Sequence, residues 1–193
     1  LEIPGRNCDQ NHLHFAFQRH RGKVYMKVHK DELYAWTFHH LHRLKGELFM
    51  QLLNVIHEQI QGAWMGVIHA ASLSSGNKAV MFPAQSGGGK STLASLLMAS
   101  GCQLLSDDFS PIAMKTGQVH AFPGGISLKA GSIPLLSNYF PELKQARRYP
   151  SPSKNGSVRY LKPRQNEFSS TAGREVSAIV FVQYDSKKTC ELK

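Results

Sequence analysis

The sequence has few cysteines, and their number and spacing argue against two kinds of small protein. Cys8, Cys102 and Cys190 are odd in number and far apart, and no two of them form a C-x-x-C pair. A disulfide framework requires an even set of cysteines, and a structural zinc site usually contains closely spaced thiol pairs. We therefore expect a protein of the reducing cytoplasm that is stabilised by its hydrophobic core.

Long apolar runs are also absent. No stretch is long and apolar enough to cross a bilayer as a helix, so we expect a soluble protein with no membrane association. Neither an initiating methionine nor a secretory signal pattern stands at Leu1. We expect the chain to be part of a longer protein.

Acidic residues are scarce. The chain has 13 of them and 23 lysines and arginines, which gives a net charge of +10. The imbalance is concentrated between residues 129 and 164, where Glu142 is the only acidic residue. Such a segment attracts nucleotide phosphates, an acidic protein or nucleic acid, although a solvated loop face is the simpler interpretation. Nucleic acid is not expected, because few aromatic residues accompany the charges and no nucleic-acid-binding module is recognisable. The basic residues are Lys129, Lys144, Arg147, Arg148, Lys154, Arg159, Lys162 and Arg164.

The first part of the chain, residues 1 to 60, changes its hydrophobic period once. Residues 13 to 38 alternate between apolar and polar in short runs, which predicts a small antiparallel meander with turns near 21 to 22 and 30 to 31. Apolar residues then recur at helical spacing, which predicts an amphipathic helix over 41 to 61.

The second part, residues 61 to 193, begins with a pattern typical of nucleotide-binding units. Two consecutive strands are predicted within residues 63 to 84, followed by a glycine-rich loop. A helix is predicted over 90 to 100, with Gly101 as its left-handed cap, and a short buried strand within 102 to 108. Strand, glycine loop, helix and strand together indicate a phosphate-binding unit.

Periodicity weakens downstream. Between residues 110 and 168 prolines and glycines are dense, so we expect loops that close over a ligand. Residues 175 to 183 predict a buried strand, followed by a polar turn and nothing that would cover it. We therefore expect this second part to be incomplete at its C-terminal end.

Residues 84 to 91, AQSGGGKS, match the P-loop pattern G-x-x-x-x-G-K-[ST] except at the first position, where Ala84 replaces glycine. The three glycines allow successive backbone N–H groups to turn toward a phosphate, and the following helix adds its positive end. Lys90 would contact the outer phosphates and the Ser91 hydroxyl would bind Mg²⁺, whereas the alternative is a turn that only caps a helix. The predicted nucleotide-binding residues are Ser86, Gly87, Gly88, Gly89, Lys90, Ser91 and Thr92.

Two aspartates follow the P-loop lysine at a sequence spacing that would suit a catalytic site. Asp107 and Asp108 lie seventeen and eighteen residues after Lys90, at the end of a strand expected beside the P-loop strand. One carboxylate can serve Mg²⁺ while the other accepts the proton of an attacking hydroxyl, although an exposed strand-end pair is equally compatible with the spacing. His69 is expected at the end of the preceding strand, where it would reach the same rim unless it is a structural histidine.

The order and spacing of these elements resemble the HPr kinase/phosphorylase family. AQSGGGKSTLASLLMASGCQLLSDD is similar to that family's core, in which P-loop, helix, glycine and DD strand come in this order. A histidine precedes the family's P-loop by fifteen residues, as His69 precedes Ala84. The stretches FPGGISLKAGSI and GSVRYLKPR are closer to the HPr-kinase-related branch. GGISLKAGS stands where true HPr kinases have EIRG, which leaves one metal ligand unassigned and places Lys129 where an arginine would make a charge contact.

The resemblance implies an α/β phosphoenolpyruvate-carboxykinase-like P-loop fold, a mixed sheet with flanking helices, preceded by a small β-rich and helical N-terminal segment. It implies ATP-dependent phosphorylation of a serine-type hydroxyl on a peptide, protein or small molecule, with ATP and Mg²⁺ bound at the loop. Asp107 would accept the proton, with His69 and Lys90 as the other catalytic residues, and Ser91 with Asp108 would hold the metal.

The resemblance also implies assembly of several copies of the chain into a homo-oligomer. HPr itself is not the expected acceptor because the EIRG stretch is missing, and acceptors such as lasso-peptide precursors fit the related branch better. The alternative function is a non-catalytic ATP-sensing module with a degenerate kinase site, which Ala84 and the missing glutamate would explain.

Overall fold

The protein is a mixed α/β structure with several small sheets and few helices. The computed structural model falls into two compact units, Leu1–Ile60 and Gln61–Lys193, and each is considered by itself. None of the helices within the described residues is long and apolar enough to cross a membrane. The structure describes residues 15 to 28, 32 to 37, 41 to 58, 62 to 122, 124 to 151, 156 to 164 and 172 to 187.

The first unit contains the expected antiparallel meander. Strands β1 (Phe15–His20), β2 (Lys23–Val28) and β3 (Glu32–Thr37) pair in sequence order. The β1–β2 turn contains Gly22 at a φ of 73°, a left-handed conformation that glycine adopts without a steric cost. The second expected turn, at residues 30 and 31, lies outside the described residues.

Helix α1 (Leu41–Ile56) forms where the apolar spacing predicted it and contacts β3 within the first unit. It is shorter than expected, because the prediction extended to residue 61. The backbone leaves the helical conformation at Glu58, whose φ of 50° lies in the left-handed region. Leu53, on the apolar side of the helix, is fully buried.

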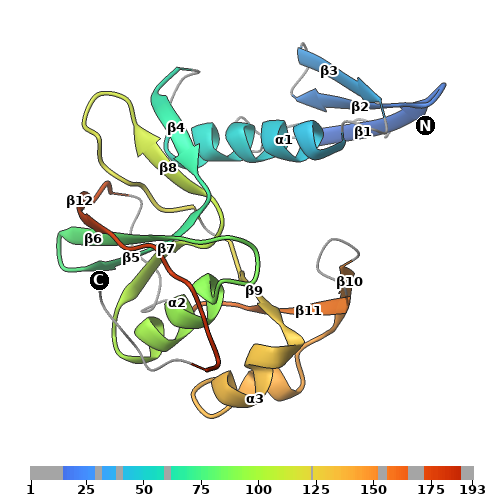
Figure 1. Ribbon diagram of the computed structural model, residues 1–193. Helices are drawn as coiled ribbons and strands as arrows, with labels where there is room; N and C mark the ends of the chain where they lie inside the picture. The colour runs from blue at the N-terminus through green and yellow to red at the C-terminus, as the bar shows by residue number, and fades with distance from the viewer. Residues whose placement is uncertain are drawn as a thin grey trace. The chain divides into compact units, whose positions relative to one another are not determined.

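The second unit is built on a four-stranded mixed sheet with the order β12-β6-β5-β7 (Figure 1). Strand β5 (Ala70–Ser75) is antiparallel to β6 (Lys78–Pro83) and to β7 (Gln103–Ser106), while β12 (Glu175–Ile179) runs parallel to β6. The sequence suggested that the strand leading to the aspartates lies next to the P-loop strand, and this was wrong: β5 lies between β6 and β7. The tight β5–β6 turn places β5 beside β6, and the chain then crosses over to the free side of β5.

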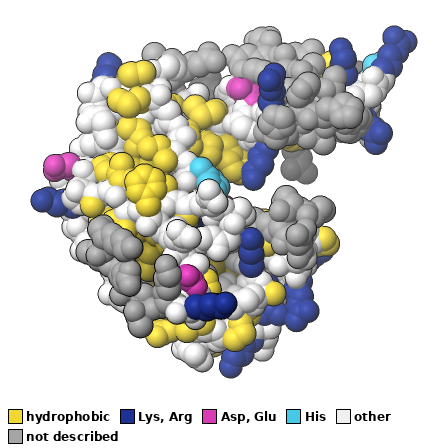
Figure 2. Space-filling model, viewed as in Figure 1, with side chains coloured by type: hydrophobic (Ala, Val, Ile, Leu, Met, Phe, Trp, Pro, Cys, Tyr) yellow, Lys and Arg dark blue, Asp and Glu magenta, His cyan; other side chains and the backbone are white. Residues whose placement is uncertain are grey.

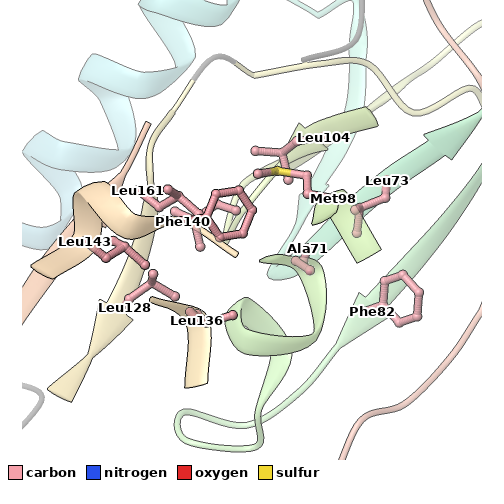
Figure 3. Packing of buried hydrophobic residues seen from close by; sticks show 12 residues of the cluster. Ala71, Leu73, Phe82, Met98, Leu104, Leu128, Leu136, Phe140, Leu143 and Leu161 are labelled. Atoms are coloured by element: carbon pink, nitrogen blue, oxygen red, sulfur yellow. The ribbon is translucent and has the colours of Figure 1, made fainter. Parts of the chain in front are cut away.

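Helix α2 (Lys90–Ala99) covers one face of this sheet. Side chains alternate along a strand, so Ala71, Leu73, Phe82 and Leu104 point toward α2 and form one core cluster (Figure 3). Helix α2 contacts both β5 and β7 of this sheet.

Strands rather than a helix cover the opposite face. Met81 and Leu105 alternate along their strands with the residues that point toward α2. They therefore point to the opposite face, where they pack against Ile112 and Val119. Ile112 lies on β8 (Ser110–Ala113), which pairs with β4 (Trp64–Ile68) in a two-stranded sheet. The expected mixed sheet is thus present, with a helix on one side and a second small sheet on the other.

Helix α2 ends as the sequence predicted. Gly101 has a φ of 100°, and its N–H donates to the carbonyl of Met98 at 3.0 Å. The N–H of Cys102 donates to the carbonyl of Leu97, also at 3.0 Å. These two bonds form a Schellman cap, which satisfies carbonyls at the end of the helix. Cys102 is a free thiol, whereas Cys8 and Cys190 lie outside the described residues.

The expectation of loops between residues 110 and 168 was wrong for part of this segment. In addition to β8 it forms the sheet β10-β11-β9, from β9 (Ile126–Lys129), β10 (Tyr149–Ser151) and β11 (Gly156–Leu161), and the short helix α3 (Ile133–Leu136). Two 3₁₀ helices, Ala130–Ser132 and Pro141–Lys144, flank α3.

These short elements complete the core against α2. Leu136, Phe140, Leu143 and Leu161 are almost fully buried and belong to the same cluster as Met98 of α2 (Figure 3). Elements of three to six residues do not show a clear hydrophobic period, which is why the sequence pattern missed them.

Strand β12 forms where it was expected, but it is not buried. Glu175, Ser177 and Ala178 are exposed, and Ile179 is 51% exposed. Within the described residues β12 pairs on one side only, with β6. Only Val176 packs against the core from this strand.

Candidate functional site

The glycine loop connects the end of β6 to the start of α2 and has a backbone that requires glycine. Gly87 and Gly89 have φ values of 95° and 92°, both left-handed. Gly88 lies in a crowded place, because a Cβ atom there would lie 3.1 Å from both the Cβ atom of Ala84 and the carbonyl oxygen of Val182. The departure from the P-loop pattern at Ala84 is therefore compensated at position 88, where the pattern tolerates any residue but this chain has glycine.

The start of α2 has the properties of an anion site. Its N-cap residue, Gly89, offers no side chain, and the first turn contains no acidic residue and no side-chain cap. The first N–H groups of a helix have no partner within the helix, and the helix dipole makes this end positive. A phosphate placed here would accept those N–H groups.

Lys90, at the first position of α2, forms a buried ion-pair cluster with both aspartates. Its Nζ atom donates to Oδ1 of Asp107 at 2.9 Å and also to Oδ1 of Asp108. The Lys90 and Asp107 side chains are 7% and 1% exposed. Burial on its own would lower the pKa of Lys90, but the two carboxylates outweigh it and raise the pKa above its usual value. Lys90 is therefore charged at neutral pH.

Asp107 also has partners other than Lys90, one on α2 and one on β9. The Ser91 hydroxyl lies 3.0 Å from each carboxylate oxygen of Asp107. The backbone N–H of Ser127, on β9, donates to Oδ2 at 3.3 Å. Asp107 is thus a fully enclosed carboxylate, bonded to the one hydroxyl that a P-loop uses for its metal.

Asp108 differs from its neighbour in exposure and backbone. Its side chain is 36% exposed, and its φ of 70° is left-handed, a conformation that aspartate tolerates better than most residues. Nε2 of His69 lies 3.7 Å from Oδ1 of Asp108, and Nδ1 of His69 lies 3.3 Å from the Asp108 carbonyl oxygen. The exposed part of the site is therefore formed by His69 and Asp108.

His69 reaches this rim by a different route from the one expected. The apolar run that was read as one strand breaks at His69 into β4 and β5, which belong to different sheets. Strand β5 is antiparallel to β6 and its first residue, Ala70, pairs with Pro83. The start of β5 therefore lies beside the end of β6, where the glycine loop begins.

Lys129 brings a second ammonium group to the loop. Its Nζ atom lies 3.6 Å from the position that a Cβ atom on Gly87 would occupy. Lys129 is the last residue of β9, so the strand that supports Asp107 also delivers this charge. The sequence indicated Lys129 as part of the basic segment from 129 to 164 and through the family resemblance.

Two features of the site were not found from the sequence. Ser72, Ser106 and Ser110, all fully buried, form a closed hydroxyl network next to the Asp107 backbone, with Oγ to Oγ distances of 2.8, 2.8 and 3.1 Å. The second is the segment after β12, where the N–H of Tyr184 donates to the carbonyl of Gly88 at 3.0 Å. Neither has a local sequence signal, because Ser72 lies 34 residues before Ser106 and Gly88 lies far from Tyr184 in the chain.

The remaining predicted residues lie on the same loop and helix. Ser86 is exposed and Thr92 is partly buried. Among the described residues no group of three or more histidines, cysteines, aspartates and glutamates could hold a metal. A metal at this site would therefore depend on few protein oxygens, those of Ser91 and of the aspartates, together with phosphate and water.

Basic side chains gather beyond the loop, on the part of the second unit that contains the β9–β11 sheet and α3. Figure 2 shows dark blue groups over the lower right of this view. Lys144, Arg147, Arg148 and Lys162 are exposed there, and Lys154 lies outside the described residues. The positive segment seen in the sequence is therefore largely a surface of the folded chain.

The fold and the site together define a mixed α/β unit with a glycine loop, a buried lysine and a pair of aspartates at its rim. The chain was compared with protein-family models and with curated proteins, and neither comparison gave a match. The family resemblance therefore stays a prediction from motif order, and the function is argued below from the contacts of the site.

Proposed function

We propose that this chain is an ATP-dependent kinase that transfers the γ-phosphoryl group to a serine-type hydroxyl of a peptide, protein or small molecule. The supporting observation is the convergence of Lys90, Ser91, Asp107 and Asp108 in one hydrogen-bonded cluster directly after a glycine loop. Phosphoryl transfer needs phosphate positioning, charge stabilisation and a carboxylate for the acceptor proton, and this cluster offers all three. The mixed sheet is compatible with the proposed phosphoenolpyruvate-carboxykinase-like P-loop fold of the HPr-kinase-related branch.

The loop and the two lysines would hold the nucleotide phosphates. The start of α2 has no side-chain cap, and Nζ of Lys129 lies 3.6 Å from the Cβ position of Gly87. Lys90 follows the loop directly, as the first residue of α2. Lys90 would stabilise the negative charge on the group being transferred, because it is charged and largely shielded from water.

Mg²⁺ fits the oxygen donors of this site. The partly buried Ser91 hydroxyl lies 3.0 Å from both oxygens of the buried Asp107 carboxylate. Mg²⁺ is usually held by one or two carboxylates while phosphates and water fill its remaining positions. When bound, the ion neutralises phosphate charge.

The contacts favour a division of roles between the aspartates that is the reverse of the one expected from the family. A base must come within about 2.6–3.2 Å of the proton it accepts. Asp107 is 1% exposed and its oxygens are already bonded to Lys90, Ser91 and Ser127. Asp108 also accepts from Lys90, through Oδ1, but its side chain is 36% exposed and lies next to the exposed His69. We therefore assign the metal-side role to Asp107 and the acceptor-side role to Asp108.

In the proposed reaction the γ-phosphoryl group moves from ATP to the acceptor hydroxyl. The acceptor hydroxyl loses its proton to the Asp108 carboxylate while its oxygen forms a bond to the γ-phosphorus. The bond between that phosphorus and the β–γ bridging oxygen breaks, and ADP leaves with the bonding electrons. His69, 3.7 Å from Asp108, would orient the carboxylate toward the acceptor.

The test is phosphate transfer from γ-labelled ATP with Mg²⁺ to a degenerate serine-peptide array and to water. We expect Asp108→Asn to lower transfer by roughly 10²- to 10⁴-fold, the usual effect of losing a general base, with ATP affinity nearly unchanged. Asp107→Asn should weaken Mg²⁺-dependent ATP binding as well. Glu142→Gln, at an exposed acid whose partner is Arg164, is the control and should change neither.

Two outcomes would contradict the proposal. Transfer that both asparagine variants leave intact would mean that the aspartate pair is not catalytic. ATP binding by the wild-type chain without transfer to any acceptor would instead favour the ATP-sensing module.

A further inference from the structure

The segment after β12 runs along the glycine loop and brings an aromatic side chain to its edge. Backbone bonds continue the pairing with β6 beyond the strand, from the N–H of Val180 to the carbonyl of Met81 at 2.8 Å and from Val182 to Pro83 at 3.1 Å. The next alternate residue, Tyr184, donates to the carbonyl of Gly88 at 3.0 Å. The chain therefore passes from the sheet onto the loop itself.

Tyr184 lies against the loop through its backbone and Cβ atom. A Cβ atom placed on Gly89 would lie 3.1 Å from Cβ and 3.9 Å from Cγ of Tyr184. The residue is nevertheless 71% exposed, so its ring is left largely in solvent beside a loop that we assign to phosphates. A soluble protein gains nothing in core stability from an aromatic ring in this position.

The sheet topology places this ring on the side where the rest of a nucleotide would go. Ligands of open α/β sheets bind beyond the carboxyl ends of the parallel strands. Strands β12 and β6 are parallel, and both Tyr184 and the glycine loop follow the carboxyl ends of their strands. The opposite neighbour of β6 is β5, beyond which lies β7, the strand that the aspartates follow. The aspartates and Tyr184 thus follow strands on opposite sides of β6.

We propose that the Tyr184 ring is the stacking platform for the base of the bound nucleotide, which makes it a specificity-determining residue of this site. The inference rests on the proposed function, because it assumes that the loop binds a nucleoside triphosphate. Loop and lysines recognise phosphates that every nucleotide shares, whereas an aromatic face recognises the base.

The test compares Mg·ATP with Mg·tripolyphosphate, which has the phosphates but no base, by calorimetry on the full chain. Loss of one stacked base costs roughly five- to a hundredfold in affinity. Tyr184→Ala should weaken ATP binding by about this factor and leave tripolyphosphate binding unchanged, while Tyr184→Phe should bind both as the wild type does. Phe181→Ala is the matched control, because Phe181 is an 83% exposed aromatic residue three positions earlier on the same segment.

The outcomes separate this inference from the proposed function. Equal weakening of both ligands by Tyr184→Ala would show that Tyr184 only braces the loop, and unchanged ATP affinity would show that the base lies elsewhere; either overturns the inference alone. If the wild-type chain binds neither ligand, the phosphate site itself fails and the inference fails with it.

Discussion

Replacement of Lys90 by methionine tests the buried charge cluster through stability, without any ligand. The substitution keeps a long side chain of similar shape but leaves the Asp107 carboxylate, 1% exposed, without its cation. Removing one partner of a buried ion pair typically costs about 3–5 kcal/mol. Asp107 keeps the Ser91 hydroxyl and the Ser127 N–H, and Asp108, 36% exposed, contributes little because solvent screens it. We therefore expect the lower end, about 3 kcal/mol.

Urea unfolding of the wild type and Lys90→Met measures this difference, and thermal unfolding should show a decrease of roughly 6–12 °C in Tm. The double variant Lys90→Met with Asp107→Asn should recover part of the loss, because a neutral amide no longer requires a cation. A single variant as stable as the wild type, or a double variant no more stable than the single one, would refute the cluster as described.

The pH dependence of the same comparison has a definite sign. The folded pKa of Lys90 is raised above its unfolded value of about 10.4, so its contribution is fully present below that pH and is lost as the pH rises through the folded pKa. The difference in unfolding free energy between wild type and Lys90→Met should be constant from neutral pH to about pH 9 and should shrink above about pH 10.4. A difference that grows at alkaline pH would contradict the assignment.

Three further substitutions test the fold around the site. Gly101→Ala should cost about 1–2 kcal/mol in urea unfolding although nothing lies within 4 Å of the new Cβ atom, because its φ of 100° is strained for alanine; an unchanged midpoint would contradict the cap. Phe140→Ala should cost about 3–5 kcal/mol, because Phe140 is 1% exposed in the core against α2, and a loss below about 1 kcal/mol would mean that this segment does not pack as described. Ser106→Ala should cost about 1 kcal/mol through loss of the buried hydroxyl network, and a stabilising effect would argue against that network.

The elements with a strong local signal were predictable from the sequence. Alternation defined the β1–β2–β3 meander, and apolar spacing with Gly101 defined α2 and its cap. The glycine loop was predictable for the same reason, since a left-handed backbone at Gly87 and Gly89 restricts the residue type directly. These features depend on neighbours within a few positions, which a single sequence contains.

The features that failed or were missed depend on tertiary partners. The break at His69 divides one apolar run between two sheets, and no local sequence signal predicted it. The short elements that carry Leu136, Phe140 and Leu143 are buried only because α2 provides their partner surface. The different environments of the two aspartates also depend on tertiary contacts, because Ser91 bonds to Asp107 and His69 lies beside Asp108. Sequence spacing alone did not distinguish the two residues.

The central claim is that residues 84 to 92 form a working phosphate site, and calorimetric titration with Mg·ATP tests it most directly. The wild-type chain and Lys90→Met should be compared at a temperature where both are folded. We predict binding of one ATP per chain by the wild type and affinity at least about tenfold weaker in the variant, the effect of losing one charge-assisted contact of about 1.4 kcal/mol or more. Absence of binding by the wild type, or equal binding by both, would contradict the account.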